Sequence, residues 1–145
     1  MKTVIQRVKE ARVKIKNQII GEINKGLLIL IGIKADDTEK DVKFLTEKIL
    51  NLRIFPDKEK KMNLSLLDIQ GEILIVSQFT LYGNCRKGKR PSFAQAAPPE
   101  IAEKLYEKFV KEIKKSGLKV KTGKFGAMMA VELINDGPIT IILET

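Results

Sequence analysis

Two short segments carry the residues best suited to chemistry. Ser77–Gly83 (SQFTLYG) follows the apolar run Ile73–Val76, and Asn135–Thr140 (NDGPIT) lies near the end of the chain. An aliphatic run that ends in Ser, Gln and Thr is typical of a buried strand delivering hydroxyls, an amide and backbone N–H groups to one end of a sheet. The chain has no His and one Cys, which excludes Ser–His, Cys–His and His-ligated metal mechanisms. We therefore expect chemistry without imidazole. We also expect no metal and no other cofactor.

The length of 145 residues suits one domain, spanning residues 1–145, with a core that needs no disulfide. The lone Cys85 cannot form an intrachain disulfide, and the residues after Met1 lack the apolar core of a signal peptide. The longest apolar run, Leu27–Ile33, is far shorter than a membrane span. We expect a soluble, cytoplasmic protein that does not associate with membranes.

The net charge of +9 is concentrated in two regions. Within residues 86–90 there are four basic side chains: Arg86, Lys87, Lys89 and Arg90. Residues 104–124 hold eight Lys against two Glu. Such clusters are typical of polyanion binding, although a high Lys and Glu content is also typical of proteins from hot environments. We interpret 104–124 as solvated surface, and residues 86–90 either contact nucleic-acid phosphates or only keep a loop soluble.

The first half of the chain predicts a strand meander. In residues 3–16, apolar side chains at the even positions Val4 and Val8 give way to the odd positions Ala11, Val13 and Ile15, which predicts a bulge or bend near Lys9–Glu10. Turns then lead into strands 19–23 and 27–33.

Two helices are predicted from their caps and apolar stripes. Thr38 and Asp41 form a capping-box pattern, and that helix ends before Pro56. The second helix begins at Pro98–Pro99 and ends at Gly117. The expected core-facing residues are Val42, Leu45, Ile49 and Leu52 in the first helix and Ile101, Leu105, Phe109 and Ile113 in the second. Segments 57–61 and 83–97 are predicted loops.

Three strands are predicted to close the fold, at 118–122, 127–134 and 139–143, with 135–138 joining the last two. Together with the strand that leads to Ser77, this predicts a single α/β domain of about seven strands and two helices in the order βββαβαβββ.

Four motifs in order make the sequence similar to the D-aminoacyl-tRNA deacylases, also called D-tyrosyl-tRNA deacylases: SQFTLYG at 77–83, RPSF at 90–93, TGKFGAMMAVEL at 122–133 and NDGPIT at 135–140. The similarity covers the whole chain, including Gln6–Val8 and Lys61–Leu64. It implies a three-layer β/β/α fold, a homodimer with sites at the subunit interface, and hydrolysis of the ester joining a D-amino acid to the 3′ end of tRNA.

The resemblance also implies roles for individual residues. The acyl carbonyl would lie near the N–H of Phe79 and beside Thr80, the two catalytic positions, with Ser77 and Gln78 shaping the pocket.

Gly137 and Pro138 match the family's cis Gly-Pro pair, which projects into the neighbouring subunit's pocket and presents carbonyls to the substrate. Arg7 and Met129 match residues that support that pair, whereas Ala130 departs from the polar residue expected there.

The residues constrain the chemistry that this family would perform. A Thr80 hydroxyl is a weak nucleophile without a base, so we favour attack by water assisted by the tRNA 2′-OH, with the Phe79 N–H stabilising the oxyanion. An apolar pocket cannot separate D from L side chains, so a rigid Gly137–Pro138 element would have to collide with the L form. Such a filter cannot reject glycine, so some activity on glycyl-tRNA is expected.

Simpler interpretations exist for each motif. Taken alone, Asn-Asp-Gly-Pro is usually a tight turn, Thr80 an ordinary strand residue and Arg7 a solvated side chain. The main alternative function is a non-catalytic basic dimer that binds tRNA or other RNA, and a third is an interaction protein that exists for its dimer interface. An RNA-binding module should show interleaved aromatic residues, but aromatics make up only 6% of this chain.

Overall fold

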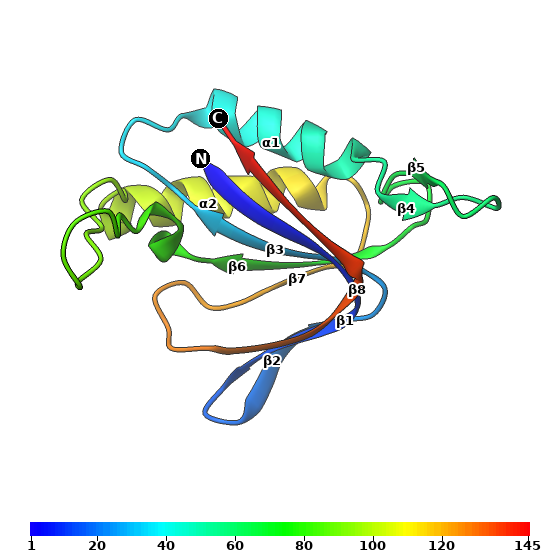
Figure 1. Ribbon diagram of the computed structural model, residues 1–145, viewed down its shortest axis with the longest axis horizontal. Coiled ribbons are helices and arrows are strands. Elements are labelled where there is room, and N and C mark those ends of the chain that lie inside the picture. The colour runs from blue at the N-terminus through cyan, green and yellow to red at the C-terminus, as the bar shows by residue number, and fades with distance from the viewer.

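Strand β1 (Lys2–Ile15) organises the computed structural model, which describes residues 1–145 (Figure 1). Along one edge β1 pairs in antiparallel fashion with β8 (Ala130–Glu144) over almost its whole length. On the other edge, the first half of β1 pairs with β3 (Gly26–Gly32) and the second half with β2 (Gln18–Ile23), both antiparallel. β1 and β8 therefore run through both parts of the sheet, the part that contains β3 and the part that contains β2.

The bend predicted near Lys9–Glu10 is confirmed by the register between β1 and β8. Val8 pairs with Asn135 and Glu10 with Ile134, so Lys9 is an extra residue in β1. A one-residue bulge bends a strand and exchanges which side chains face each side, as the parity change in the sequence indicates. At this bend β1 and β8 curve together away from the larger part of the sheet (Figure 1).

The larger part of the sheet continues from β3 into β6 (Glu72–Ser77) and β7 (Val120–Thr122), which are parallel to one another. Helices α1 (Glu39–Asn51) and α2 (Pro99–Lys114) pack together and cover one face (Figure 1). β2 contacts β6 and β7 on the opposite face. The three-layer β/β/α arrangement is thus confirmed.

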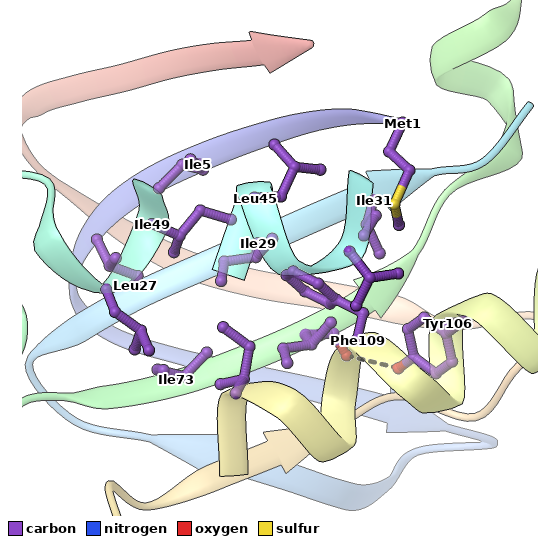
Figure 2. Packing of buried hydrophobic residues seen from close by; sticks show 14 of the residues in the cluster. Met1, Ile5, Leu27, Ile29, Ile31, Leu45, Ile49, Ile73, Tyr106 and Phe109 are labelled. Carbon is purple, nitrogen blue, oxygen red and sulfur yellow. Dashed lines mark hydrogen bonds between the residues drawn. The ribbon is translucent and has the colours of Figure 1, made fainter. Parts of the chain in front are cut away.

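The alternation of side chains along β6 explains why two separate cores form. Ile73 and Ile75 face the helices, and Leu74 and Val76 face β2. Figure 2 shows the helix-side core, whose labelled side chains are Met1, Ile5, Leu27, Ile29, Ile31, Leu45, Ile49, Ile73, Tyr106 and Phe109. The core between the two β layers consists of Val8, Ala11, Val13, Ile23, Leu28, Leu74 and Val76.

The predicted helix starts agree with the structure. Thr38 and Asp41 form a capping box at the start of α1, and Pro99 occupies the first turn of α2. Neither helix is long and apolar enough to cross a membrane.

One residue of the predicted α2 stripe was placed wrongly, since Ile101 is 44% exposed. It lies in the first turn, where it lines a surface groove with Lys104 and Leu105. The buried face instead includes Tyr106, whose hydroxyl donates to the Ile75 carbonyl at 3.1 Å (Figure 2). Burial raises the pKa of Tyr106 to about 12.

Three local details differ from the sequence prediction. The strands expected at 127–134 and 139–143 are one element, β8, because both stretches pair with the single long strand β1. The predicted loop 57–61 is flanked by a small hairpin, β4 (Phe55–Pro56) with β5 (Met62–Leu64). The segment after Ser77 turns at once into a short 3₁₀ helix, η1 (Phe79–Tyr82), instead of continuing as a strand.

Candidate active site

The end of β6 presents backbone N–H groups. Ser77 is the last strand residue, and the Gln78 N–H continues the ladder by donating to the Ile31 carbonyl at 2.8 Å. The chain then turns into η1, so Phe79 and Thr80 are its first residues. The first N–H groups of a helical turn have no acceptor within it, and no turn or loop hydrogen bond uses either group. Both remain available to an external acceptor.

The side chains at this end offer hydrogen bonds but no base. Gln78 Nε2 donates to Thr80 Oγ1 at 2.5 Å. An amide NH₂ group cannot accept the proton of a hydroxyl, and Thr80 has no hydrogen bond to a carboxylate or an amine. Thr80 is therefore placed as a polar neighbour of the N–H groups rather than as an activated nucleophile.

The second segment, 135–138, is a bulge in β8 supported by Asn135. The Asn135 Nδ2 group donates to the carbonyl of Arg7 and to that of Ile139, both at 2.9 Å. The peptide bond between Gly137 and Pro138 is cis, and both residues are exposed. Gly137 has φ +123°, and a Cβ there would lie 2.8 Å from Ile139 Cγ1 and 3.0 Å from an Arg7 guanidinium nitrogen. Only glycine fits this position without displacing its neighbours.

Arg7 anchors the bulge from beneath, and it is only 8% exposed. Its NH1 group donates to the Ile54 carbonyl at 2.6 Å, on the segment after α1. Its Nε group donates to the Asp136 carbonyl at 3.2 Å and lies 3.0 Å from Asp136 Oδ2. A buried guanidinium with a carboxylate and two carbonyl partners is well compensated, so it fixes the bulge relative to the helix layer.

The two segments lie at opposite ends of the sheet within one chain. Gly26 of β3 pairs with Glu72 at the start of β6 and with Val8 beside the bulge, whereas Ser77 is at the other end of β6. At about 3.3 Å per residue, the five steps from Glu72 to Ser77 span roughly 17 Å. In Figure 1 the turn after β6 is on the left and the bend of β8 is on the right. One copy of the chain therefore does not bring Phe79 and Gly137 together.

This geometry separates the two residues expected to support the Gly-Pro pair. Arg7 does contact the bulge of its own chain. Met129 instead packs on the core between the β layers, which contains Val76, and so lies near the Phe79 end. Within its own chain Met129 does not contact Gly137 or Pro138, because β8 carries the two positions to different ends of the sheet.

The basic cluster lies on an exposed loop beside the Phe79 end. Backbone hydrogen bonds between Asn84 and Ser92, at 2.8 and 3.0 Å, close this loop around Arg86, Lys87, Lys89 and Arg90. None of these four side chains forms an ion pair within the chain.

Sequence reasoning missed three contributors to these sites. They are Phe93, whose ring packs against Phe79, and the Asn135 amide and the Ile54 carbonyl, which hold the bulge. Phe93, the last residue of the RPSF motif, could have been noticed as an aromatic residue three positions after the basic cluster. The role of the Ile54 main-chain carbonyl has no signal in the sequence.

Comparisons with known proteins agree over the whole chain. The sequence model of the family described as D-Tyr-tRNA(Tyr) deacylase matches residues 4–144. A protein of Thermosipho africanus named D-aminoacyl-tRNA deacylase is 60% identical over 145 residues, covering 100% of this chain and 97% of that protein. One of the same name from Clostridioides difficile is 58% identical, with the same coverage of each chain.

Two solved structures are similar to this chain. A c-Myc DNA unwinding element binding protein has a TM-score of 0.94 and 45% identity, covering 100% of this chain and 99% of the other. A structure described as a probable eukaryotic D-amino acid tRNA deacylase has a TM-score of 0.85 at 20% identity, with 98% and 97% coverage, and it supports the fold alone.

The Arg7 anchor can be tested by mutation. We expect Arg7→Met to lower the free energy of unfolding by ~3 kcal/mol, because it leaves Asp136 and the Ile54 carbonyl without their partner. Arg12→Met is the matched control, since Arg12 pairs with Glu132 at the surface and should matter little. Urea denaturation of both variants measures the difference, and equal stability would show that Arg7 does not hold the bulge.

Proposed function

Because this chain belongs to the D-aminoacyl-tRNA deacylase family and is therefore a hydrolase, we propose that it works as a homodimer whose two active sites each combine residues of both subunits. In each site the end of β6 in one subunit receives the 135–138 bulge of the other. The substrate is a tRNA that carries a D-amino acid, or glycine, in ester linkage at its 3′ end.

The observation that carries this proposal is the separation of the two segments along one sheet. Phe79 offers a free N–H at one end, and Gly137–Pro138 projects into solvent at the other. In a pair related by a two-fold axis, the same surface meets itself, so each bulge can reach the partner's N–H groups and two identical sites arise.

The proposed chemistry relies on main-chain groups and on the substrate. The N–H groups of Phe79 and Thr80 donate to the carbonyl oxygen of the ester and stabilise it as it becomes an oxyanion, while Ser77 and Gln78 shape the pocket floor. Water attacks the carbonyl carbon, and the adjacent 2′-OH of the terminal ribose assists it. The C–O ester bond then breaks, which gives a free D-amino acid and a tRNA with its 3′-OH restored.

Selection by handedness falls to the Gly137–Pro138 bulge of the partner. Its carbonyls face the amino group and the α-carbon, where an L side chain would collide and a D side chain would point away. The Arg7 and Asn135 contacts keep the bulge stiff enough for such a collision to be costly. We place Met129 of the receiving subunit at the rim of the same pocket, because it lies near Val76.

Arg86, Lys87, Lys89 and Arg90 are proposed to bind phosphates of the tRNA, because they are exposed and free of acidic partners beside the Phe79 end. This tRNA chemistry is consistent with a cytoplasmic enzyme. A non-catalytic RNA-binding dimer using the same basic surface remains the second candidate, and the assay below separates the two.

Stereoselective hydrolysis is the primary test. With purified protein, we expect rapid release of tyrosine from D-tyrosyl-tRNA, little from L-tyrosyl-tRNA, and measurable hydrolysis of glycyl-tRNA, which has no side chain to collide. Amino-acid release from each labelled tRNA is followed over time against a protein-free control. Equal D and L rates would contradict the chiral filter, complete inertness towards glycyl-tRNA would contradict its steric basis, and no release at all would leave only binding.

The main-chain mechanism predicts opposite outcomes at two adjacent residues. Thr80→Ala should lose no more than about tenfold in kcat, the worth of one ordinary hydrogen bond. Phe79→Pro removes an N–H and should cost on the order of 100-fold or more, whereas Phe79→Ala removes the ring but keeps the N–H and should cost much less. Single-turnover assays with D-tyrosyl-tRNA give these rates. Isolation of a covalent acyl-enzyme at Thr80 would overturn the mechanism.

Shared sites predict complementation between two defective variants. Phe79→Pro and Gly137→Ala each damage one half of the site, and unfolding and refolding them together yields mixed dimers. Each mixed dimer has one intact site, so an equal mixture should recover about one quarter of wild-type activity. Each variant refolded alone provides the control. If the mixture is no more active than its components, the site lies within one chain.

A further inference from the structure

Phe79 and Phe93 form an aromatic pair that the chain leaves open to solvent. Phe79 is 58% exposed and Phe93 is 37% exposed, with ring centroids 5.0 Å apart and planes at 70°. Large aromatic side chains usually lie in cores, so two in contact at the surface indicate a binding function. In an edge-to-face pair each ring leaves at least one face uncovered by the other, and an uncovered face can stack on a flat ligand.

The pair is held in place by the surrounding backbone. Gly83 lets the Phe93 ring lie against the turn, because a Cβ at Gly83 would be 3.1 Å from Phe93 Cε1. The Phe93 carbonyl accepts the Ala96 N–H at 3.0 Å, and the Asn84–Ser92 hydrogen bonds close the loop just before it. The rings therefore form a ledge that is in position before any ligand arrives.

The charge next to this ledge indicates the ligand. Phe93 follows the loop that carries Arg86, Lys87, Lys89 and Arg90, which lack ion-pair partners. Open aromatic faces beside unpaired cations are the combination that binds single-stranded nucleic acid, in which bases stack on the rings and the backbone pairs with the cations.

We propose that the Phe79–Phe93 ledge stacks a nucleobase of the single-stranded tRNA 3′ end upstream of the aminoacylated nucleotide. This rests on the proposed function, which puts the ester at the N–H of Phe79. The ring of that same residue then faces away from the ester towards the preceding nucleotides. The basic residues 86–90 neutralise the phosphates of this segment.

The test compares a full substrate with one that lacks the upstream nucleotides. Wild-type protein and Phe93→Ala are assayed for kcat/KM on D-tyrosyl-tRNA and on 3′-D-tyrosyl-adenosine. We expect kcat/KM on the tRNA divided by kcat/KM on the adenosine ester to fall ~5-fold or more in Phe93→Ala, which corresponds to the loss of one base stack. Phe93→Leu, which fills the space without a π face, should behave like Phe93→Ala, and Phe93→Trp should restore the ratio.

Phe44→Ala is the matched control, because Phe44 is also an exposed aromatic with a nearby lysine but lies on α1. It should leave the ratio unchanged. An equal fall of kcat/KM on both substrates in Phe93→Ala would show that Phe93 only supports the pocket, and unaltered kcat/KM on both substrates would show that no base stacks there; either result overturns the proposal.

Failure of the proposed function would look different, since wild-type protein would then release no D-tyrosine from either substrate. In that case the ledge is tested by measuring the affinity of wild-type protein and Phe93→Ala for uncharged tRNA, with and without its single-stranded 3′ end. If Phe93→Ala weakens binding of the full tRNA but not of the tRNA that lacks its 3′ end, the ledge is supported. If Phe93→Ala weakens binding of both RNAs equally, the proposal is overturned.

Discussion

The continuous pairing of β1 with β8 is the constraint on which the rest of the structure depends. β8 occupies one edge of β1 almost throughout, while the other edge of β1 passes from β3 to β2. Any bend in β1 must therefore be matched in β8. From Gln6 to Val8, β1 advances two residues, whereas its partners in β8, Thr140 and Asn135, are five apart. The excess chain leaves the ladder as the bulge that carries Gly137 and Pro138.

A bulge of this size removes several backbone groups from the ladder, and side chains take over their hydrogen bonds. The Asp136 carbonyl is bonded by Arg7, and the carbonyls of Arg7 and Ile139 by the Asn135 amide. Buried polar groups of the main chain need such partners. The same contacts therefore stabilise the fold and stiffen the bulge, which explains why Arg7 is buried in a strand where an arginine would otherwise be solvated.

The sequence predicted well whatever depends on periodicity and local caps. The parity change between Val8 and Ala11 located the one-residue bulge at Lys9 in β1, and Thr38 with Asp41 located the start of α1. It failed where long-range pairing decides the outcome, since nothing local shows that both halves of β8 pair with one strand. For the candidate site, motif resemblance proposed Ser77–Thr80 and Gly137–Pro138, but it could not show that Met129 lies far from the bulge of its own chain. Main-chain partners such as the Ile54 carbonyl leave no pattern in side chains.

In the proposed mechanism, catalysis and selectivity come from backbone amides and carbonyls, which do not titrate near neutral pH. Their weakness is that they work only when held rigidly, because an amide that must reorganise contributes little to a transition state. Placing one set at the end of a sheet strand and the other on a bulge tied to β1 meets this requirement, since both belong to the same hydrogen-bonded sheet. β6, which spans roughly 17 Å, keeps the two sets at opposite ends of this sheet. In a two-fold dimer both subunits have this same arrangement, so the fit of each shared site would depend on sheet geometry and the subunit interface rather than on a mobile loop.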